Sequence, residues 1–299
     1  MSEINKKKRN RGLPAWVVVF PLIDLALIIR YFIHGKNIAL FNPKGVIAGQ
    51  QHVLIVFTLI VLLAVAIPTL SLLFFIAWKY RETNPKAKHD PQPSHGRLFN
   101  LGIWAIPTSI MVLLVSVMAP ATHQLAPQKV IAAGVKPMTI EVISLRWKWL
   151  FIYPEQQVAS LNFVQLPVDT PITFEMTADE TPMSSFWIPN LGGQLYTMTS
   201  HVNRLNLMAS TTGDYTGSSA ELNGAGFAGM KFTTSVRSAE AFDNWVQFVK
   251  QSPNALDATT YKKLLEPSES NPASFYSSFD PNLYANVISK YEGPGGHHH

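Results

Sequence analysis

Cysteine is absent from all 299 residues of the sequence, and charged side chains are scarce. The absence of cysteine excludes disulfide bonds, a cysteine nucleophile, Cys-ligated zinc and iron–sulfur clusters. Asp, Glu, Lys and Arg make up only 14% of the residues, whereas 47% are hydrophobic. An ordinary soluble domain is roughly one-quarter charged. This deficit of charge, combined with so much apolar sequence, indicates a membrane protein.

The formal net charge of +5 is divided unevenly along the chain. Residues 1–128 hold 13 Lys and Arg against 4 Asp and Glu, whereas residues 129–299 hold 11 against 15. A nucleic-acid-binding protein usually carries a basic face on its folded domain. Here the second half is mildly acidic, and the positive charge adjoins apolar runs. The pattern therefore indicates membrane topology and no nucleic-acid partner.

Three apolar stretches occupy the first half, at residues 13–33, 53–78 and 98–119. About 20 apolar residues in a helix cross a bilayer core, so the second and third stretches predict a transmembrane hairpin within residues 37–125. The first stretch contains Asp24, which is costly inside a membrane. It is either an uncleaved third helix or a cleaved signal peptide. The lack of a small-residue cleavage motif directly after it favours the helix.

Basic residues set the expected orientation, because they favour the cytoplasmic side of a membrane. A Lys and Arg cluster precedes the first stretch, and five more basic residues lie within residues 79–97. Both segments are therefore expected in the cytoplasm. The chain after about residue 120 then lies on the outer side, whether or not the first stretch is cleaved, and is predicted to form a periplasmic or extracellular domain.

The outer part shows the period-two alternation of β-strands. Short strand-like segments bounded by Pro and Asp predict an all-β sandwich or barrel. The predicted strands lie at residues 139–145, 147–153, 159–167, 172–177, 186–188, 193–198, 204–208 and 229–235. After Ser238 the pattern becomes helical, with Phe242, Trp245 and Val249 on one face, and two further short helices are expected. The chain is expected to begin with a basic N-terminus and the first apolar helix (residues 1–36), followed by the hairpin (37–125). An outer β domain (126–237), a helical extension (238–291) and a flexible or tag-like tail (292–299) are expected to follow.

The outer domain offers little material for catalysis. Outside the tail it contains one histidine, His201. A mononuclear cupredoxin copper site needs two His and a Cys thiolate, and zinc hydrolase sites also need more ligands than are present. Serines are available, but no Gly-x-Ser-x-Gly elbow accompanies them. No catalytic residue is therefore predicted in this chain.

Three blocks of the outer domain together resemble subunit II of the haem–copper respiratory oxidases. They are an aromatic run at residues 147–154, Ser-Phe-Trp-Ile-Pro at 185–189 and Ser-x-Glu-x-Asn-x-x-x-Phe-x-x-Met at 219–230. The resemblance extends from about residue 42 to about residue 291. It implies a membrane-anchored α+β protein with a cupredoxin-like sandwich after the transmembrane helices.

In the cytochrome c oxidase branch of that family, the resemblance implies a dinuclear copper centre. The positions of its two His and two bridging Cys ligands are occupied in this sequence by Ser184, Phe227, Ser219 and Asn223. The two positions that match are Glu221, whose family role is to offer a backbone carbonyl, and Met230. One thioether is a weak copper ligand without thiolates beside it. The resemblance therefore implies no metal in this chain.

The pattern is most similar to the quinol oxidase branch, and within it to the bo-type ubiquinol oxidases. That resemblance implies a non-catalytic subunit of a proton-pumping oxidase in a bacterial inner membrane, which stabilises and caps subunit I. Subunit I would carry the haems and copper, and ubiquinol would be the substrate of the complex. Two alternatives remain open: a cytochrome c oxidase subunit II that has lost its copper, and a membrane-tethered cupredoxin-like binding or assembly module without an oxidase.

Several residues are candidate contacts to subunit I. Many family members have Glu four residues before the Trp of the last span, where this sequence has Asn100 before Trp104. Asn cannot ionise, so a role in proton uptake at this position is in doubt. Trp147 and Trp149 either pack within the sandwich or contact subunit I. Asp24 is expected to meet a polar group of a neighbouring subunit.

Overall fold

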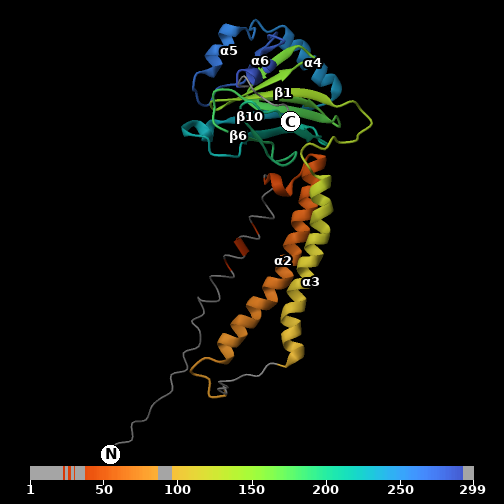
Figure 1. Ribbon diagram of the computed structural model, residues 1–299, viewed down its shortest axis with the longest axis vertical. Helices are drawn as coiled ribbons and strands as arrows, with labels where there is room; N and C mark the ends of the chain where they lie inside the picture. The colour runs from red at the N-terminus through yellow and green to blue at the C-terminus, as the bar shows by residue number, and fades with distance from the viewer. Residues whose placement is uncertain (1–22, 24–25, 28–29, 31–37, 87–95, 292–299) are drawn as a thin grey trace, which may run out of the picture. The chain divides into compact units, whose positions relative to one another are not determined.

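The computed structural model describes residues 38–86 and 96–291, together with residues 23, 26, 27 and 30 (Figure 1). Asp24 and nearly all of the first apolar stretch lie outside the described residues, so the predictions for them stay predictions. The chain divides into two units, residues 1–42 and residues 43–299. Within the first unit, a short 3₁₀ helix covers Ala39–Phe41.

Two long helices begin the second unit, α2 at Val46–Lys79 and α3 at Arg97–Gln124 (orange and yellow in Figure 1). Both are long and apolar enough to cross a membrane by length and composition. Hydroxyl side chains within them donate to the backbone carbonyl four residues earlier, as Thr58 does to Leu54 at 2.8 Å and Thr108 to Trp104 at 2.7 Å. Such bonds satisfy a hydroxyl where no water is available.

Helix α2 starts seven residues before the predicted span because its first turn is tied to the β domain. The amides of Lys44 and Ala48 donate to the carbonyls of Asn190 and Leu191, at 2.8 and 3.0 Å. Gly45 is required at the closest approach, since a Cβ there would lie 2.6 Å from the Leu191 carbonyl oxygen. Sequence hydropathy marks only the continuous apolar part of a helix, so the first two turns, which end in Gln50, Gln51 and His52, were missed.

The β domain consists of two packed sheets, which confirms the predicted sandwich. Their strand orders are β11-β3-β2-β1-β5-β8 and β4-β10-β9-β6-β7. The pairs β1–β5 and β4–β10 are parallel, and the other pairs are antiparallel. The strands are β1 Met138–Leu145, β2 Lys148–Tyr153, β3 Val158–Leu161, β4 Phe163–Pro167, β5 Ile172–Ala178, β6 Ser184–Trp187, β7 Leu195–Thr197, β8 Asn203–Leu207, β9 Gly213–Ser219, β10 Lys231–Arg237 and β11 Ser274–Tyr276.

Aromatic side chains fill the space between the sheets. Trp149 lies edge-on to Phe186 at 5.3 Å between ring centroids, and Phe186 stacks on Phe232 at 5.1 Å. Phe151 and Phe174 join this group, and all five side chains are buried. Aromatic pairs at such separations contribute about 0.5–1.5 kcal/mol each beyond the area they bury. The group therefore fixes the spacing of β2, β6 and β10.

A second apolar layer covers the outer face of the six-stranded sheet. It is built by the C-terminal helices α5 (Ala258–Leu265) and α6 (Leu283–Ser289), whereas α4 (Ala239–Lys250) packs its apolar face onto the first core. Tyr261 and Tyr284 cover Ile143 and Ile152 in this layer. All six residues of β2 are consequently buried, on both faces of the sheet.

Asp179, in the loop after β5, fastens this layer to the sandwich. Its buried carboxylate accepts hydrogen bonds from Tyr261 Oη at 2.6 Å, Tyr291 Oη at 2.7 Å and Lys290 Nζ at 2.9 Å. Burial, and then the bond to Asp179, raises the pKa of the Tyr261 hydroxyl. One carboxylate thus joins α5 and the end of α6 to the sheet.

Lys148 makes a second attachment, from β2. Its buried ammonium donates to the Glu266 carbonyl and to Ser268 Oγ, each at 2.7 Å. Burial lowers the pKa of Lys148, and the nearby Glu266 opposes that shift. The segment after α5 is therefore held by a charge-assisted contact from the strand beneath it.

Candidate functional site

The structure brings together four of the six residues at the positions aligned with copper ligands. Ser184 begins β6, Ser219 ends β9, Asn223 lies in the loop after β9, and Met230 immediately precedes β10. Pairing of β6 with β9 and of β9 with β10 fixes the positions of the three strand-end residues. All four side chains are buried.

The Asn223 carboxamide connects the members of this cluster. Its Nδ2 lies 2.7 Å from Ser184 Oγ and 3.0 Å from Met230 Sδ, as donor to both. Ser219 Oγ donates to the backbone carbonyl of Glu221 at 3.0 Å. Ser184, Asn223 and Met230 therefore bond to one another and Ser219 bonds to nearby backbone, whereas Asn223 Oδ1 has no hydrogen-bond partner among the described residues.

These residues do not fit a dinuclear copper centre. Two hydroxyls, an amide and one thioether supply neither the thiolates nor the imidazoles that such a centre needs. The Met230 sulfur and the Glu221 carbonyl already accept hydrogen bonds from Asn223 and Ser219. Phe227, at the second His position, places a half-buried ring in the short helix η2 (Ala225–Gly229). Among the described residues, no group of three His, Asp or Glu is placed to hold a metal ion.

Trp147 packs onto the loop that carries Asn223. Its indole lies against Gly224 and Gly226, where a Cβ at Gly224 would sit 3.2 Å from the ring and a Cβ at Gly226 would overlap it. Gly224 also has φ +122°, a conformation that other residues rarely adopt. Glycine at both positions lets the aromatic ring cover the loop.

The remaining candidate contacts differ in exposure. Trp149 is completely buried, so it has no surface to offer subunit I, and its role is packing between the sheets. Asn100 and Trp104 lie exposed on the first two turns of α3. A contact from these two residues to another subunit stays a prediction. His201 is exposed, with Nδ1 3.1 Å from both Ser200 Oγ and the Thr199 carbonyl oxygen.

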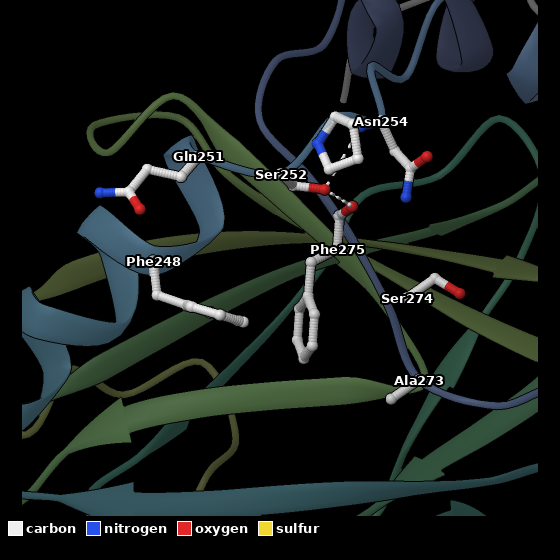
Figure 2. A pocket seen from close by; sticks show the side chains of 8 residues that line it. Phe248, Gln251, Ser252, Asn254, Ala273, Ser274 and Phe275 are labelled. Atoms are coloured by element: carbon white, nitrogen blue, oxygen red, sulfur yellow. Dashed lines mark hydrogen bonds between the residues drawn. The ribbon is translucent and has the colours of Figure 1, made fainter.

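Figure 2 shows a hollow of about 410 Å³ where the end of α4 meets β11. The Phe248 and Phe275 rings meet edge-on at 6.1 Å, and Ser252 Oγ donates to the Phe275 carbonyl at 2.9 Å. Gln251 and Asn254 add amide groups to its rim. None of its lining residues titrates near neutral pH, so the hollow offers no acid–base chemistry.

Comparison with known proteins gives a consistent result. A protein 40% identical over 95% of this chain and 88% of its own length is the cytochrome bo(3) ubiquinol oxidase subunit 2 of Pseudomonas putida. The ubiquinol oxidase subunit 2 of Acetobacter aceti is 39% identical over 86% of this chain and 84% of its own length. The chain belongs to the ubiquinol oxidase subunit 2 family. The resemblance inferred from the three sequence blocks is thereby confirmed.

A profile described as the COX Aromatic Rich Motif matches residues 250–295. The crystal structure of the periplasmic domain of subunit II of cytochrome oxidase (CoxB) of Bradyrhizobium japonicum is also similar, at 22% identity with a TM-score of 0.35 over 42% of this chain and 95% of that chain. In this ubiquinol oxidase subunit 2 homologue, the matched region contains the edge strand β11 of the six-stranded sheet and the helices α5 and α6, which cover that sheet. Helices were predicted there from the sequence, but the aromatic layer was not, although four Tyr and two Phe between residues 261 and 291 mark it.

Proposed function

We propose that the chain is a non-catalytic, membrane-anchored subunit of a complex that oxidises ubiquinol and reduces oxygen while pumping protons. It stabilises and caps subunit I, which carries the haems and copper. The observation that carries this proposal is the cluster around Asn223, which donates to Ser184 and Met230 at positions where copper-bearing relatives bind metal. The relatives named ubiquinol oxidase subunit 2 support the same substrate.

The physical argument concerns where electrons enter. A soluble donor such as cytochrome c approaches from the outer face, so its electrons need a relay centre in the outer domain. Ubiquinol is apolar and arrives within the bilayer, where it reduces a haem of subunit I directly. A relay in the outer domain then has no task, and the domain can keep its fold with a metal-free cluster.

The test is oxygen uptake by the complex that co-purifies with the full chain in mild detergent. Rapid uptake with a ubiquinol analogue and none with reduced cytochrome c is the expected result. Met230→Leu is the matched variant, since it removes the one soft ligand and keeps the volume of the side chain. It should leave ubiquinol oxidation unchanged.

Three outcomes would contradict the proposal. Uptake with reduced cytochrome c would indicate an oxidase of the other branch. Loss of ubiquinol oxidation in a folded Met230→Leu complex would indicate that the sulfur serves electron transfer. A chain that purifies without haem or oxygen uptake would be a tethered binding or assembly module.

We further propose that α2 and α3 span the bacterial inner membrane, with residues 79–97 in the cytoplasm and the β domain in the periplasm. The helices support this by length and apolar composition. Because the chain has no native cysteine, single-cysteine labelling is unambiguous. In spheroplasts, an impermeant maleimide should label Glu240→Cys on α4 at once and Glu82→Cys only after permeabilisation. The reverse order would overturn the orientation.

A further inference from the structure

Two glutamates stand side by side on the outer face of the six-stranded sheet. Glu141 of β1 and Glu175 of β5 are direct partners in a parallel pair, so their side chains project from the same face. Glu175 in turn faces Arg204 of β8, with 2.8 Å between Oε1 and Nε. The row therefore contains two carboxylates and one guanidinium, and Glu141 has no ion-pair partner among the residues that the structure describes.

The other neighbours of Glu141 are apolar or buried. On β2 its partner is Ile152, which belongs to the layer covered by α6. From α6 itself comes Tyr284, whose ring is buried and whose hydroxyl has no hydrogen-bond partner among the described residues. Both carboxylates and Arg204 act electrostatically on that hydroxyl. Glu175, Arg204 and Tyr284 are thus the titratable groups that face Glu141.

This arrangement favours a proton over an ion pair. Two ionised carboxylates on adjacent strands repel each other, and the single Arg204 compensates only the one to which it is paired. Protonation of Glu141 removes the repulsion and leaves a neutral group beneath the apolar layer.

We propose that Glu141 holds a proton beside the Glu175–Arg204 ion pair while α6 is docked, and that this proton secures helix α6 against the sheet. The packing of α6, and with it the C-terminal aromatic layer, against the sheet then depends on pH; we call this arrangement the latch. Loss of the proton places a second negative charge beneath Tyr284 and Ile152 and loosens α6. The inference rests on the strand register and the packing of α6, and it holds whether or not the complex oxidises ubiquinol.

The direction of the pH effect follows from the acid involved. Burial, and then the neighbouring Glu175, raises the pKa of Glu141 from 4.5 to about 7. The docked state therefore holds the proton more tightly than the open state does. Docking of α6 is strongest below about pH 4.5, weakens as the pH rises to about 7 and stays at its weaker level above that.

The test is amide hydrogen exchange of residues 283–289 in the full chain in detergent, from about pH 5 to about pH 8, corrected for the intrinsic pH dependence of exchange. Because Glu141 is only half-buried, screening reduces the full effect, and we expect opening of α6 to increase about tenfold over this range. Glu141→Gln imitates the protonated form and should keep α6 protected at every pH. Glu155→Gln, which removes an exposed carboxylate paired with Lys136, is the matched control and should behave like the native chain.

Two results would overturn the latch. The first is an exchange rate of residues 283–289 in the native chain that, after correction for intrinsic exchange, does not change with pH. This measurement does not depend on the folding of any variant. The other is a Glu141→Gln chain that keeps the native pH dependence. Glu175→Gln adds an independent check, because it frees Arg204 to pair with Glu141. Because this pairing lowers the pKa of Glu141 in the docked state, the weakening of α6 should be smaller and complete at a lower pH, and an unchanged profile would contradict the proposal.

Discussion

Replacing Asp179 by alanine should detach the C-terminal aromatic layer more strongly than any surface charge change would. The carboxylate is buried and accepts three hydrogen bonds, from Tyr261, Lys290 and Tyr291. These donors come from α5 and from the segment that ends α6. No other described side chain lies in position to take over all three bonds.

The magnitude follows from what each donor does after the substitution. The Tyr261 hydroxyl is buried and loses its acceptor, which costs about 1–3 kcal/mol. Lys290 and Tyr291 are nearer the surface and regain water, so their bonds contribute less. The total destabilisation is about 3 kcal/mol. For a domain of this size it corresponds to a fall in Tm of roughly 6–12 °C.

The assay is thermal unfolding of the full chain in detergent, followed by tyrosine absorbance and by tryptic cleavage near Lys290. Asp214→Ala is the control, because Asp214 is exposed and also accepts bonds, from Arg237 at 2.7 Å and Ser235 at 2.8 Å. It should cost less than about 1 kcal/mol. If the Asp179 and Asp214 variants lost the same unfolding free energy, the three hydrogen bonds to the buried Asp179 carboxylate would not be what holds the layer.

Three further changes test the metal-free loop. Asn223→Ala removes the donor shared by Ser184 and Met230 and should lower the unfolding free energy by about 1–2 kcal/mol in denaturant titration; no loss would show that the amide bonds are incidental. Gly226→Ala drives a methyl into the Trp147 indole and should lower the unfolding free energy by about 1–3 kcal/mol. Adding Trp147→Ala should relieve that clash. A double variant less stable than the sum of the two single changes would contradict the proposed clash. A copper chelator should leave Tm unchanged, since a ligand bound only by the folded state would raise Tm by linkage.

The sequence predicted the architecture where apolar pattern and strand alternation are strong. Hydropathy located both long helices, and alternation located most strands of the sandwich. It failed at residues 159–167, where one predicted strand is two, β3 and β4, in different sheets. Asn162 makes the break: it has φ +53°, and its carboxamide accepts from the Trp149 amide at 2.8 Å and donates to the Asn271 carbonyl at 3.0 Å. No periodicity in the sequence records such a contact.

Strand β9 was missed for a different reason. Its sequence, Gly213–Ser219, has Tyr215 as its one large apolar residue. The strand is stabilised by pairing with β10, and Gly217 leaves room for the ring of Phe232 across the pair. Its place in the sheet is decided by a neighbour's bulk, which local propensity does not contain.

For the candidate site, motif spacing predicted which residues occupy the former ligand positions, but not what they do there. That Asn223 bonds to both Ser184 and Met230 depends on β6, β9 and β10 meeting at one end of a sheet. The Glu141–Glu175 pair depends on a parallel register between strands 34 positions apart in sequence. Alternation gives the face on which a side chain lies, whereas only topology gives its neighbour.

The loop after β9 is held by contacts that need no metal ion. A dinuclear centre would cross-link β6 to both ends of this loop, and its loss would leave those segments without a common anchor. Here one amide joins Ser184 to Met230, and one indole covers Gly224 and Gly226. Two short-range contacts thus replace two sets of metal–ligand bonds. Because neither contact needs an ion, the two contacts can hold this end of the sandwich together without a metal.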